Sequence, residues 1–283
     1  HRVANLLKYG RGSDSDEVPA DATEEDLAFL KAYLEHPDPQ QEYRARQLCA
    51  VQPALPWSII AITFTNKAAG ELKERLEAML GSEAADVWAS TFHSACVRIL
   101  RRDIDRLGFD KSFTIYDSAD SQRVIKDIVK EFQYDEKAFQ PRTVLGYISS
   151  AKDAMVLPEQ FAQEWVTPGD WRMERIAKIY REYVRRLREA NALDFDDIIL
   201  HAVTLLQQFD EVRHYYQRKF RYVLIDEYQD TNNLQYLLSS LLAGERSNIC
   251  VVGDDDQSIY RFRGANIENI LSFEKDYPKA RVI

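Results

Sequence analysis

The chain has 283 residues, a formal net charge of −9 and a hydrophobic fraction of 45%. This length allows one large domain or two with a substantial core, and the composition is that of a globular protein. No apolar run reaches the length of a membrane span. The acidic balance is weak evidence against a nucleic-acid partner, because a local groove can still be basic.

The three cysteines are odd in number and far apart in the sequence: Cys49, Cys96 and Cys250. The sequence contains no CxxC pair and no His/Cys spacing typical of a metal site, which favours a reduced, cytoplasmic protein. The first residue is His1 and no secretory leader is visible, so we expect a piece of a longer chain.

The first 56 residues show no chemical motif. Residues 1–9 have the pattern of the end of an amphipathic helix, and residues 10–25 are polar and acidic, as in a surface loop. A capping signal at residues 23–26 precedes a helical pattern that stops at His36-Pro37. We interpret residues 10–56 as a peripheral insertion.

Two strand–turn–helix units follow. Residues 58–63 predict a strand that enters the polar turn 64–67, and residues 87–90 predict a strand that enters the turn 91–93. The turns carry hydroxyl, amide, ammonium and imidazole groups, which suit phosphates, and phenylalanine rings, which can stack on bases. The alternative is structural: in the first turn Thr65 caps the helix and Phe64 packs in the core, and in the second turn His93 is a structural residue at a helix start.

A third short strand is expected at residues 113–117. From residue 118 to 218 helical patterns dominate and no convincing strand occurs, which indicates a helical domain inserted into an α/β domain. Its long helix places Glu182 and Arg186 at i,i+4. The segment 193–197 (Leu-Asp-Phe-Asp-Asp) begins a further helix. Its carboxylates could suggest a metal site, but acidic residues also stabilise a first helical turn.

The α/β pattern returns near residue 219. Residues 222–225 predict a buried strand of a parallel sheet, which ends at Asp226 and Glu227. Ligands bind at the carboxyl ends of such strands. An aspartate there can hold Mg²⁺ on a nucleotide, and a glutamate beside it can take a proton from water. Strand ends that only face solvent show the same pattern.

A further strand at residues 248–252 enters a loop with many functional groups. Residues 253–264 hold three carboxylates, one amide, two aromatic rings and two arginines. The Gln257 amide can both donate and accept a hydrogen bond. Tyr260 and Phe262 can stack on bases, and Arg263 can bind a phosphate or stack on a base.

With these motifs in this order, the chain resembles the superfamily 1 DNA helicases of the UvrD/PcrA/Rep type over roughly residues 57–283. Residues 61–69 resemble motif Ia, and residues 91–93 resemble the single-strand-binding motif that follows it. Residues 224–231 resemble motif II, and residues 252–265 resemble motif III. The segment 193–197 also matches a stretch near the end of the family's inserted helical domain.

The resemblance implies an α/β fold, namely a RecA-like P-loop NTPase parallel sheet with an inserted all-helical domain. It implies three parts: residues 1–117 as the first part of the ATPase domain, with 10–56 as its insertion, 118–218 as the helical domain and 219–283 as the second part of the ATPase domain. It also implies ATP and Mg²⁺ as cofactors, and single-stranded DNA and single/double-strand junctions as partners. The implied activity is 3′-to-5′ translocation in DNA repair or replication.

The resemblance assigns Asp226 to Mg²⁺, Glu227 to water activation and Gln257 to coupling between the γ-phosphate and DNA. Nine side chains are then candidates for nucleic-acid binding: Thr63, Phe64, Asn66, Thr91, Phe92, His93, Tyr260, Phe262 and Arg263. Position 262 is often Trp in the family, and Phe keeps the stacking role with a smaller ring.

Two family features are not in this sequence. No Gly is followed by Lys, so we expect the phosphate-binding loop upstream of residue 1. The arginine that stabilises γ-phosphate charge, and the second motor domain, are expected after residue 283. We therefore expect the isolated chain to be inactive as an ATPase. Two alternatives stay open: a module that binds single-stranded nucleic acid or another protein, and the motor part of a helicase-nuclease.

Overall fold

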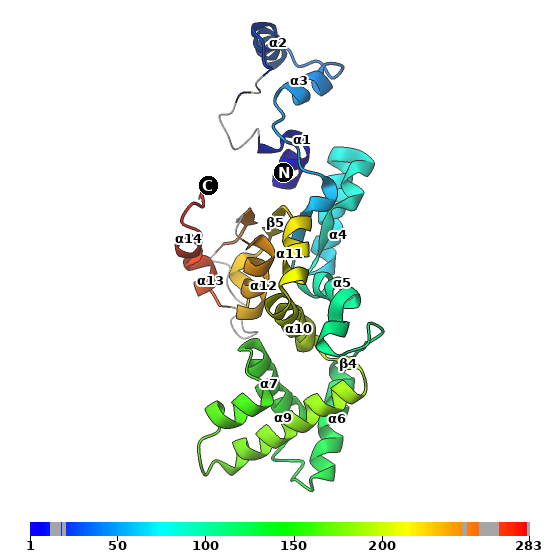
Figure 1. The fold of residues 1–283 in the computed structure, drawn as a ribbon, viewed down its shortest axis with the longest axis vertical. Helices are drawn as coiled ribbons and strands as arrows, with labels where there is room; N and C mark the ends of the chain where they lie inside the picture. The colour runs from blue at the N-terminus through cyan, green and yellow to red at the C-terminus, as the bar shows by residue number, and fades with distance from the viewer. Residues whose placement is uncertain (12–17, 19–20, 245–247, 255–265, 282–283) are drawn as a thin grey trace.

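The computed structural model describes residues 1–11, 18, 21–244, 248–254 and 266–281. The molecule is elongated, with a parallel sheet and its helices in the middle (Figure 1). A hairpin of α2 (Glu24–Glu35) and α3 (Glu42–Leu48) lies at one end. A helical block of α6 (Ser118–Glu131), α7 (Pro141–Asp153) and α9 (Trp171–Glu189) lies at the other. Among the described residues, no helix is both long and apolar enough to cross a membrane.

The central sheet has four parallel strands in the order β2-β1-β5-β6. Their bounds, in that order, are Trp88–Thr91, Ile59–Thr63, Tyr222–Ile225 and Ile249–Val251. β1 is an apolar run rich in β-branched residues, and all five of its residues are buried, as expected for a strand covered on both faces. The four strands predicted for this sheet are confirmed within one or two residues at their ends.

Helices cover both faces of the sheet, because successive strand residues point to opposite sides. Ile60 and Ile62 belong to the core cluster on one face, and Ile59 and Ala61 belong to the cluster on the other. The helices of the first face are α5 (Phe92–Asp103), α10 (Phe195–Gln208), α11 (Asp210–Lys219) and α12 (Asn233–Ala243). Those of the second face are α1 (Arg2–Tyr9) and α4 (Asn66–Leu80).

The helical block has a hydrophobic cluster of its own, whose buried members run from Ile125 to Ala192. Asp117 and Asp120 form a capping box at the start of α6, and the Asp170 side chain caps α9. The helices predicted here are confirmed, and α8 (Pro158–Gln160) and the π-helical turn η5 (Phe161–Trp165) were not predicted. The domain boundaries near residues 118 and 218 stay a prediction.

The strand expected at residues 113–117 differs from the prediction. It is reduced to β3 (Thr114–Ile115), which pairs in parallel with β4 (Ala192–Leu193) in a separate two-stranded sheet. The expectation that no strand lies between 118 and 218 is therefore wrong at β4. Two residues are too few for an alternating or continuous pattern, so the sequence gives no sign of this pairing.

The insertion after α1 begins and ends at the same place in the fold, where Tyr9 and Arg11 lie beside Val51. Arg11 N–H donates to the Val51 carbonyl (2.8 Å), and Val51 N–H donates to the Tyr9 carbonyl (2.9 Å). Between them, Thr23 and Asp26 form the expected capping box of α2, which buries none of its residues. Gly10 lies at the crossing with φ +58°, where a Cβ would stand 2.3 Å from two carbonyl oxygens. Only glycine fits this approach.

The remaining described elements are short. They are the 3₁₀ turns η2 (Pro56–Ser58), η3 (Gly81–Asp86), η4 (Ile104–Leu107) and η6 (Tyr228–Asp230), and the helices α13 (Glu268–Leu271) and α14 (Phe273–Asp276). α13 packs on η6, which directly follows the two carboxylates at the end of β5.

Candidate active site and nucleic-acid interface

The two carboxylates of the central motif lie at the carboxyl end of β5. Asp226 N–H donates to the Ile62 carbonyl (3.0 Å), so the chain is still paired with β1 at this residue. The next residue, Glu227, has left-handed backbone angles (φ 51°, ψ 44°), which are uncommon for a residue other than glycine. Both side chains are exposed at the sheet edge, where parallel α/β sheets bind their ligands.

The electrostatics of this edge fit a divalent cation. Partial burial raises the pKa of the Asp226 carboxyl, and the Glu227 carboxylate also raises it, while the Glu227 N–H opposes both through a hydrogen bond. Burial and Glu227 also raise the pKa of Asp230, one of whose carboxylate oxygens is buried without a partner among the described residues. Mg²⁺ needs only one or two protein carboxylates besides phosphates and water, so a single carboxylate at the position of Asp226 would be enough protein ligand for it.

Gln229, which sequence reasoning missed, connects this edge to the neighbouring strand. It is 1% exposed. Its Nε2 donates to Glu227 Oε2 (2.7 Å), and its Oε1 accepts from the Asp254 N–H (3.1 Å). Asp254 follows β6 and begins the functional loop. Four predicted site residues of that loop lie outside the described residues: Gln257, Tyr260, Phe262 and Arg263.

A pocket of about 350 Å³ lies at the carboxyl ends of β1 and β2. It brings together the six predicted residues of the two turns with three that were not predicted. The lining residues are Thr63, Phe64, Thr65, Asn66, Thr91, Phe92, His93, Phe195 and Gln235. Parallel strands end at one edge, so turns that are distant in sequence meet here.

Two helices begin at this pocket. The Thr65 hydroxyl accepts from Ala68 N–H at the start of α4 (3.1 Å), and the Thr91 hydroxyl accepts from Ser94 N–H at the start of α5 (3.2 Å). The structural interpretation of Thr65 as a helix cap is therefore confirmed, and the cap at Thr91 was not predicted. The same geometry turns two helix N-termini, with their partial positive charge, toward the pocket, an arrangement that suits phosphate.

Two of the predicted contacts need correction. Phe92 is 1% exposed and packs edge-on beneath Phe64 with the ring centres 5.5 Å apart, so it supports Phe64 and offers no face to a base. Thr63 is 3% exposed, and its hydroxyl donates to the Thr65 carbonyl (3.2 Å). Burial of both side chains follows from their strand and helix positions, which residue type alone does not reveal.

The missed residue Phe195 stacks on His93, with ring centres 4.0 Å apart and planes at 30°. Phe195 is 58% exposed. Burial lowers the pKa of His93 to about 4, against a hydrogen bond to the Phe195 backbone, so the imidazole is neutral at physiological pH. His93 therefore offers a ring and a polar nitrogen but no positive charge. The signal for Phe195 was its place in the segment 193–197, in which only the carboxylates were considered as site residues.

The carboxylates of that segment have a structural role. Asp194 and Asp197 form a reciprocal capping box at the start of α10, and Lys152 Nζ lies 2.7 Å from Asp194 and 2.8 Å from Asp197. In the described part of the chain, no group of three or more His, Cys, Asp or Glu side chains could hold a metal ion. Asp196 and Asp197 lie in the first turn of α10, as the helix-dipole explanation expects, while the cap at Asp194 and the buried lysine were not predicted.

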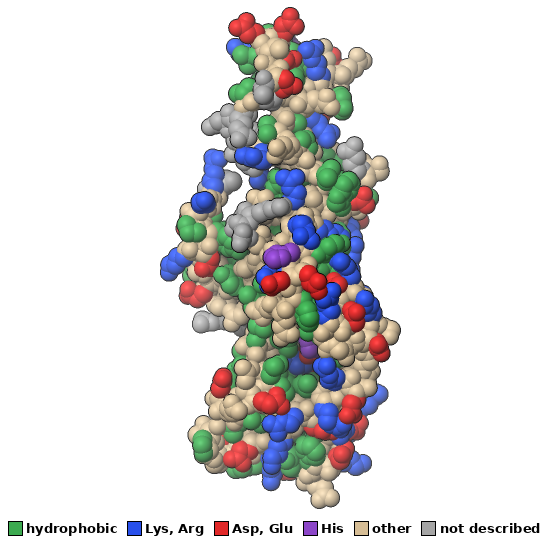
Figure 2. Space-filling view, in the orientation of Figure 1, with side chains coloured by type: hydrophobic (Ala, Val, Ile, Leu, Met, Phe, Trp, Pro, Cys, Tyr) green, Lys and Arg blue, Asp and Glu red, His purple; other side chains and the backbone are tan. Residues whose placement is uncertain are grey.

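The face of the molecule seen in Figure 2 is not uniformly acidic. Figure 2 shows acidic and basic side chains mixed over the helical block and around the middle of the molecule. The formal charge of −9 therefore says little about any single groove.

The fold and the carboxylates at this edge of the sheet define the class of protein. A parallel sheet covered by helices on both faces, with adjacent carboxylates at the end of its central strand and a helical block between the strands, is a RecA-like α/β architecture. The chain matches the model of the UvrD/REP helicase N-terminal domain over residues 42–278, and it belongs to that family.

Similar proteins carry helicase names. Over 241 residues the chain is 53% identical to the ATP-dependent DNA helicase PcrA of Bacillus subtilis (strain 168). It is 50% identical to the protein of the same name from Staphylococcus aureus (strain Mu50) and 49% identical to that from Staphylococcus epidermidis. These matches cover 85% of this chain and 32–33% of the relatives. The chain thus spans about a third of the length of the curated relatives it matches.

Proposed function

We propose that this chain is part of the motor of an ATP-dependent DNA helicase that moves along single-stranded DNA. The observation that carries the proposal is the exposed Asp226–Glu227 pair at the carboxyl end of the central parallel strand, in a member of this family. Movement 3′ to 5′, action at single/double-strand junctions in repair or replication, and a cytoplasmic location belong to the same proposal and rest on the family resemblance.

In this proposal the two carboxylates have different tasks. Asp226 would hold Mg²⁺, which supplies charge neutralisation at the phosphates of bound ATP. Glu227 accepts the proton of the attacking water, and its exposed position at the strand end leaves room for that water. Gln257 would couple the γ-phosphate to DNA.

The pocket at the ends of β1 and β2 is the proposed site for the single strand. Phe64 and Phe195 offer the rings for bases, with His93 supporting Phe195 from behind. The N-termini of α4 and α5, with Asn66, offer N–H groups for phosphates. The binding strength then comes from stacking and backbone donors, and His93 adds no charge.

The test of the chemistry is Mg-ATP hydrolysis by the full-length protein with and without single-stranded DNA. We expect Glu227→Gln to lower kcat by about 10²- to 10⁴-fold with nucleotide binding retained, because the proton acceptor is removed and the shape is kept. The matched control is Glu174→Gln, an exposed position in the first turn of α9, which should leave kcat unchanged. Turnover at the wild-type rate in Glu227→Gln contradicts the proposal.

A further inference from the structure

Gln229 is a buried amide whose two ends bind two different motifs. Its Nε2 donates to the Glu227 carboxylate at 2.7 Å, and its Oε1 accepts from the backbone N–H of Asp254 at 3.1 Å. The side chain is 1% exposed, so water does not compete for either bond. Because an amide has its donor and acceptor on one planar group, a shift at one end moves the other.

The fit around this amide is tight. A Cβ on Gly253 would stand 2.6 Å from Gln229 Oε1 and 2.7 Å from Ile270 Cδ1, so the glycine leaves the space that the amide occupies. The backbones are joined on both sides of the contact. Tyr228 N–H donates to the Val252 carbonyl (2.9 Å), and Val252 N–H donates to the Ile225 carbonyl (2.9 Å). The Gln229 side chain is thus held in a tightly packed position between the ends of β5 and β6.

Glu227 depends on this amide for its orientation. Its backbone is in the left-handed region, and its side chain is exposed. Among the described residues, Gln229 is the one hydrogen-bond partner of its carboxylate. A carboxylate that is otherwise free in solvent takes many rotamers, and one charge-assisted bond from a fixed donor selects among them.

We infer that Gln229 is a positioning residue that ties the orientation of Glu227 to the backbone of the loop beginning at Asp254. This inference rests on the proposed function, which gives Glu227 the proton transfer and gives that loop the contacts with DNA. In this inference, a displacement of the Asp254 backbone on DNA binding turns the Gln229 amide and reorients the Glu227 carboxylate. DNA then influences hydrolysis through the Gln229 side chain, in addition to the coupling proposed for Gln257.

Three variants test the two hydrogen bonds of the amide separately. Gln229→Met keeps the length of the side chain and loses both bonds. Gln229→Glu keeps the acceptor for Asp254 N–H and loses the donor to Glu227. Gly253→Ala keeps the residue Gln229, but the added methyl group displaces its Oε1. The matched control is Gln217→Met, because Gln217 also donates from Nε2, to the Leu241 carbonyl at 2.8 Å, on the outer helices α11 and α12.

The first measurement is hydrogen exchange at the Asp254 amide in the full-length protein, which requires no turnover. We expect faster exchange in Gln229→Met and Gly253→Ala, and wild-type protection in Gln229→Glu and Gln217→Met. Unchanged exchange in both Gln229→Met and Gly253→Ala overturns the contact on which the inference is built.

The second measurement is the ratio of DNA-stimulated to basal kcat. We expect it to fall by about tenfold in Gln229→Met, Gln229→Glu and Gly253→Ala, with KM for ATP unchanged, because positioning of the acceptor is lost and nucleotide binding is not. A purely structural role would lower the melting temperature and reduce both rates by the same factor. The effects of Gln229→Met and Gly253→Ala on this ratio should also not add in the double variant, since both break the same contact between Gln229 and Asp254 N–H.

The outcomes separate this inference from the proposed function. Wild-type turnover in Glu227→Gln removes the proposed function, and this inference with it. If Glu227→Gln abolishes turnover while both Gln229 variants keep the wild-type stimulation ratio, the proposed function stands and the role of Gln229 is wrong.

Discussion

Lys152 Nζ lies 2.7 Å from Asp194 Oδ2, and the two side chains are only 1% and 7% exposed. Asp197 Oδ1 lies 2.8 Å from the same ammonium group, and the Tyr183 hydroxyl donates to Asp194 at 2.8 Å. Burial opposes the charge of Lys152, but attraction to Asp197 and Asp194 outweighs it and raises the pKa of the lysine. This buried cluster joins α7 of the helical block to the start of α10, which packs against the helices of the sheet.

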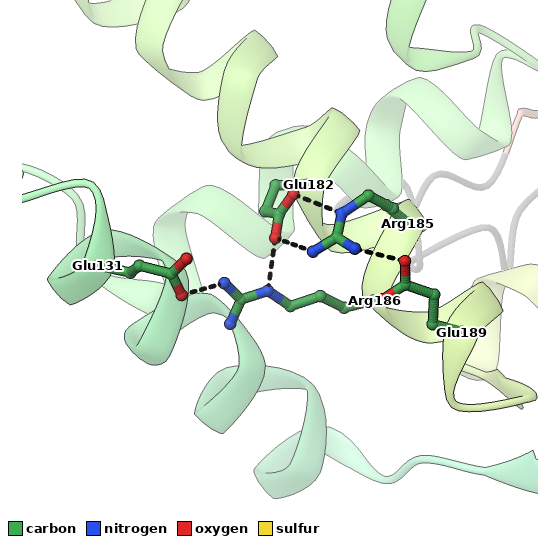
Figure 3. A network of polar contacts seen from close by, with 5 residues as sticks. All are labelled: Glu131, Glu182, Arg185, Arg186 and Glu189. Carbon is green, nitrogen blue, oxygen red and sulfur yellow. Dashed lines mark hydrogen bonds and ion pairs between the residues drawn. The ribbon is translucent and has the colours of Figure 1, made fainter.

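Removing the lysine should be costly. We expect Lys152→Met to lower the free energy of unfolding by about 3–5 kcal/mol, because two buried carboxylates lose their counter-charge. The control is Arg185→Met in the surface network of Glu131, Glu182, Arg185, Arg186 and Glu189 (Figure 3). The Arg185 side chain is 53% exposed, so the free energy of unfolding should fall far less in this variant. Urea unfolding measures both, and equal losses would contradict the distinction.

Asp153 predicts a pH dependence at the same junction. It accepts a hydrogen bond from Asn232 Nδ2 (3.1 Å), at the start of α12. Burial, together with Asp196, raises its pKa from 3.8 to about 7. Between these values the folded state binds more protons than the unfolded state, so the contribution of this group to stability is present at low pH and is lost as pH rises through 7.

The variant Asp153→Asn removes this titration and keeps the acceptor for Asn232. We expect it to raise the melting temperature more at pH 8 than at pH 5, because asparagine resembles the protonated carboxyl group. Thermal unfolding of the wild type and the variant at the two pH values provides the measurement. An equal change at both pH values would show that Asp153 is ionised in the folded state at pH 5.

The sequence predicts the features that depend on a few adjacent residues. The apolar runs of β1 and β5, the capping box at Thr23, and the carboxylates after β5 all follow from local pattern. The resemblance to the helicase family added the roles expected of the motif residues. The side of the sheet at which these turns meet follows from the parallel arrangement alone, because parallel strands share a carboxyl edge.

Contacts between distant residues were beyond this reasoning. Phe195 meets His93 across a long stretch of chain, and Lys152 looks like any surface lysine until two carboxylates are found around it. Phe64 and Phe92 have the same side chain in similar turns, yet only Phe92 is fully buried. Burial is a property of the packed elements, so residue type and spacing do not determine it.

Phe195 gives the sharpest test of the proposed single-strand site. We expect Phe195→Ala to weaken single-stranded DNA binding of the full-length protein by about 5- to 150-fold, because one stacked base contributes about 1–3 kcal/mol. The salt dependence of binding should keep its slope, since no charge is removed. The control is Trp171→Ala, an aromatic residue of the helical block that is 55% exposed. Equal affinity in Phe195→Ala and wild type, measured by fluorescence anisotropy, would exclude this ring from the site.

The insertion should be removable without loss of the fold or of the motor. Its ends are already joined through the backbone bonds between Tyr9, Arg11 and Val51, and α2 buries no residue. A short Gly/Ser linker in place of residues 12–49 closes a smaller loop, which costs little entropy. α2 lies outside the family match, while α3 lies within it and buries only Ala45. We expect a melting temperature within a few degrees of wild type and unchanged DNA-stimulated hydrolysis.

The matched variant for this deletion is Gly10→Ala. Its Cβ would meet the Gln52 and Val51 carbonyl oxygens at 2.3 Å at a φ of +58°. We expect it to destabilise the fold by about 1–3 kcal/mol, because the crossing point must open. The deletion thus removes many residues at little cost, while the glycine variant adds one methyl group at a larger cost. A deletion that unfolds the protein or abolishes DNA stimulation would show that α2 and α3 belong to the working motor.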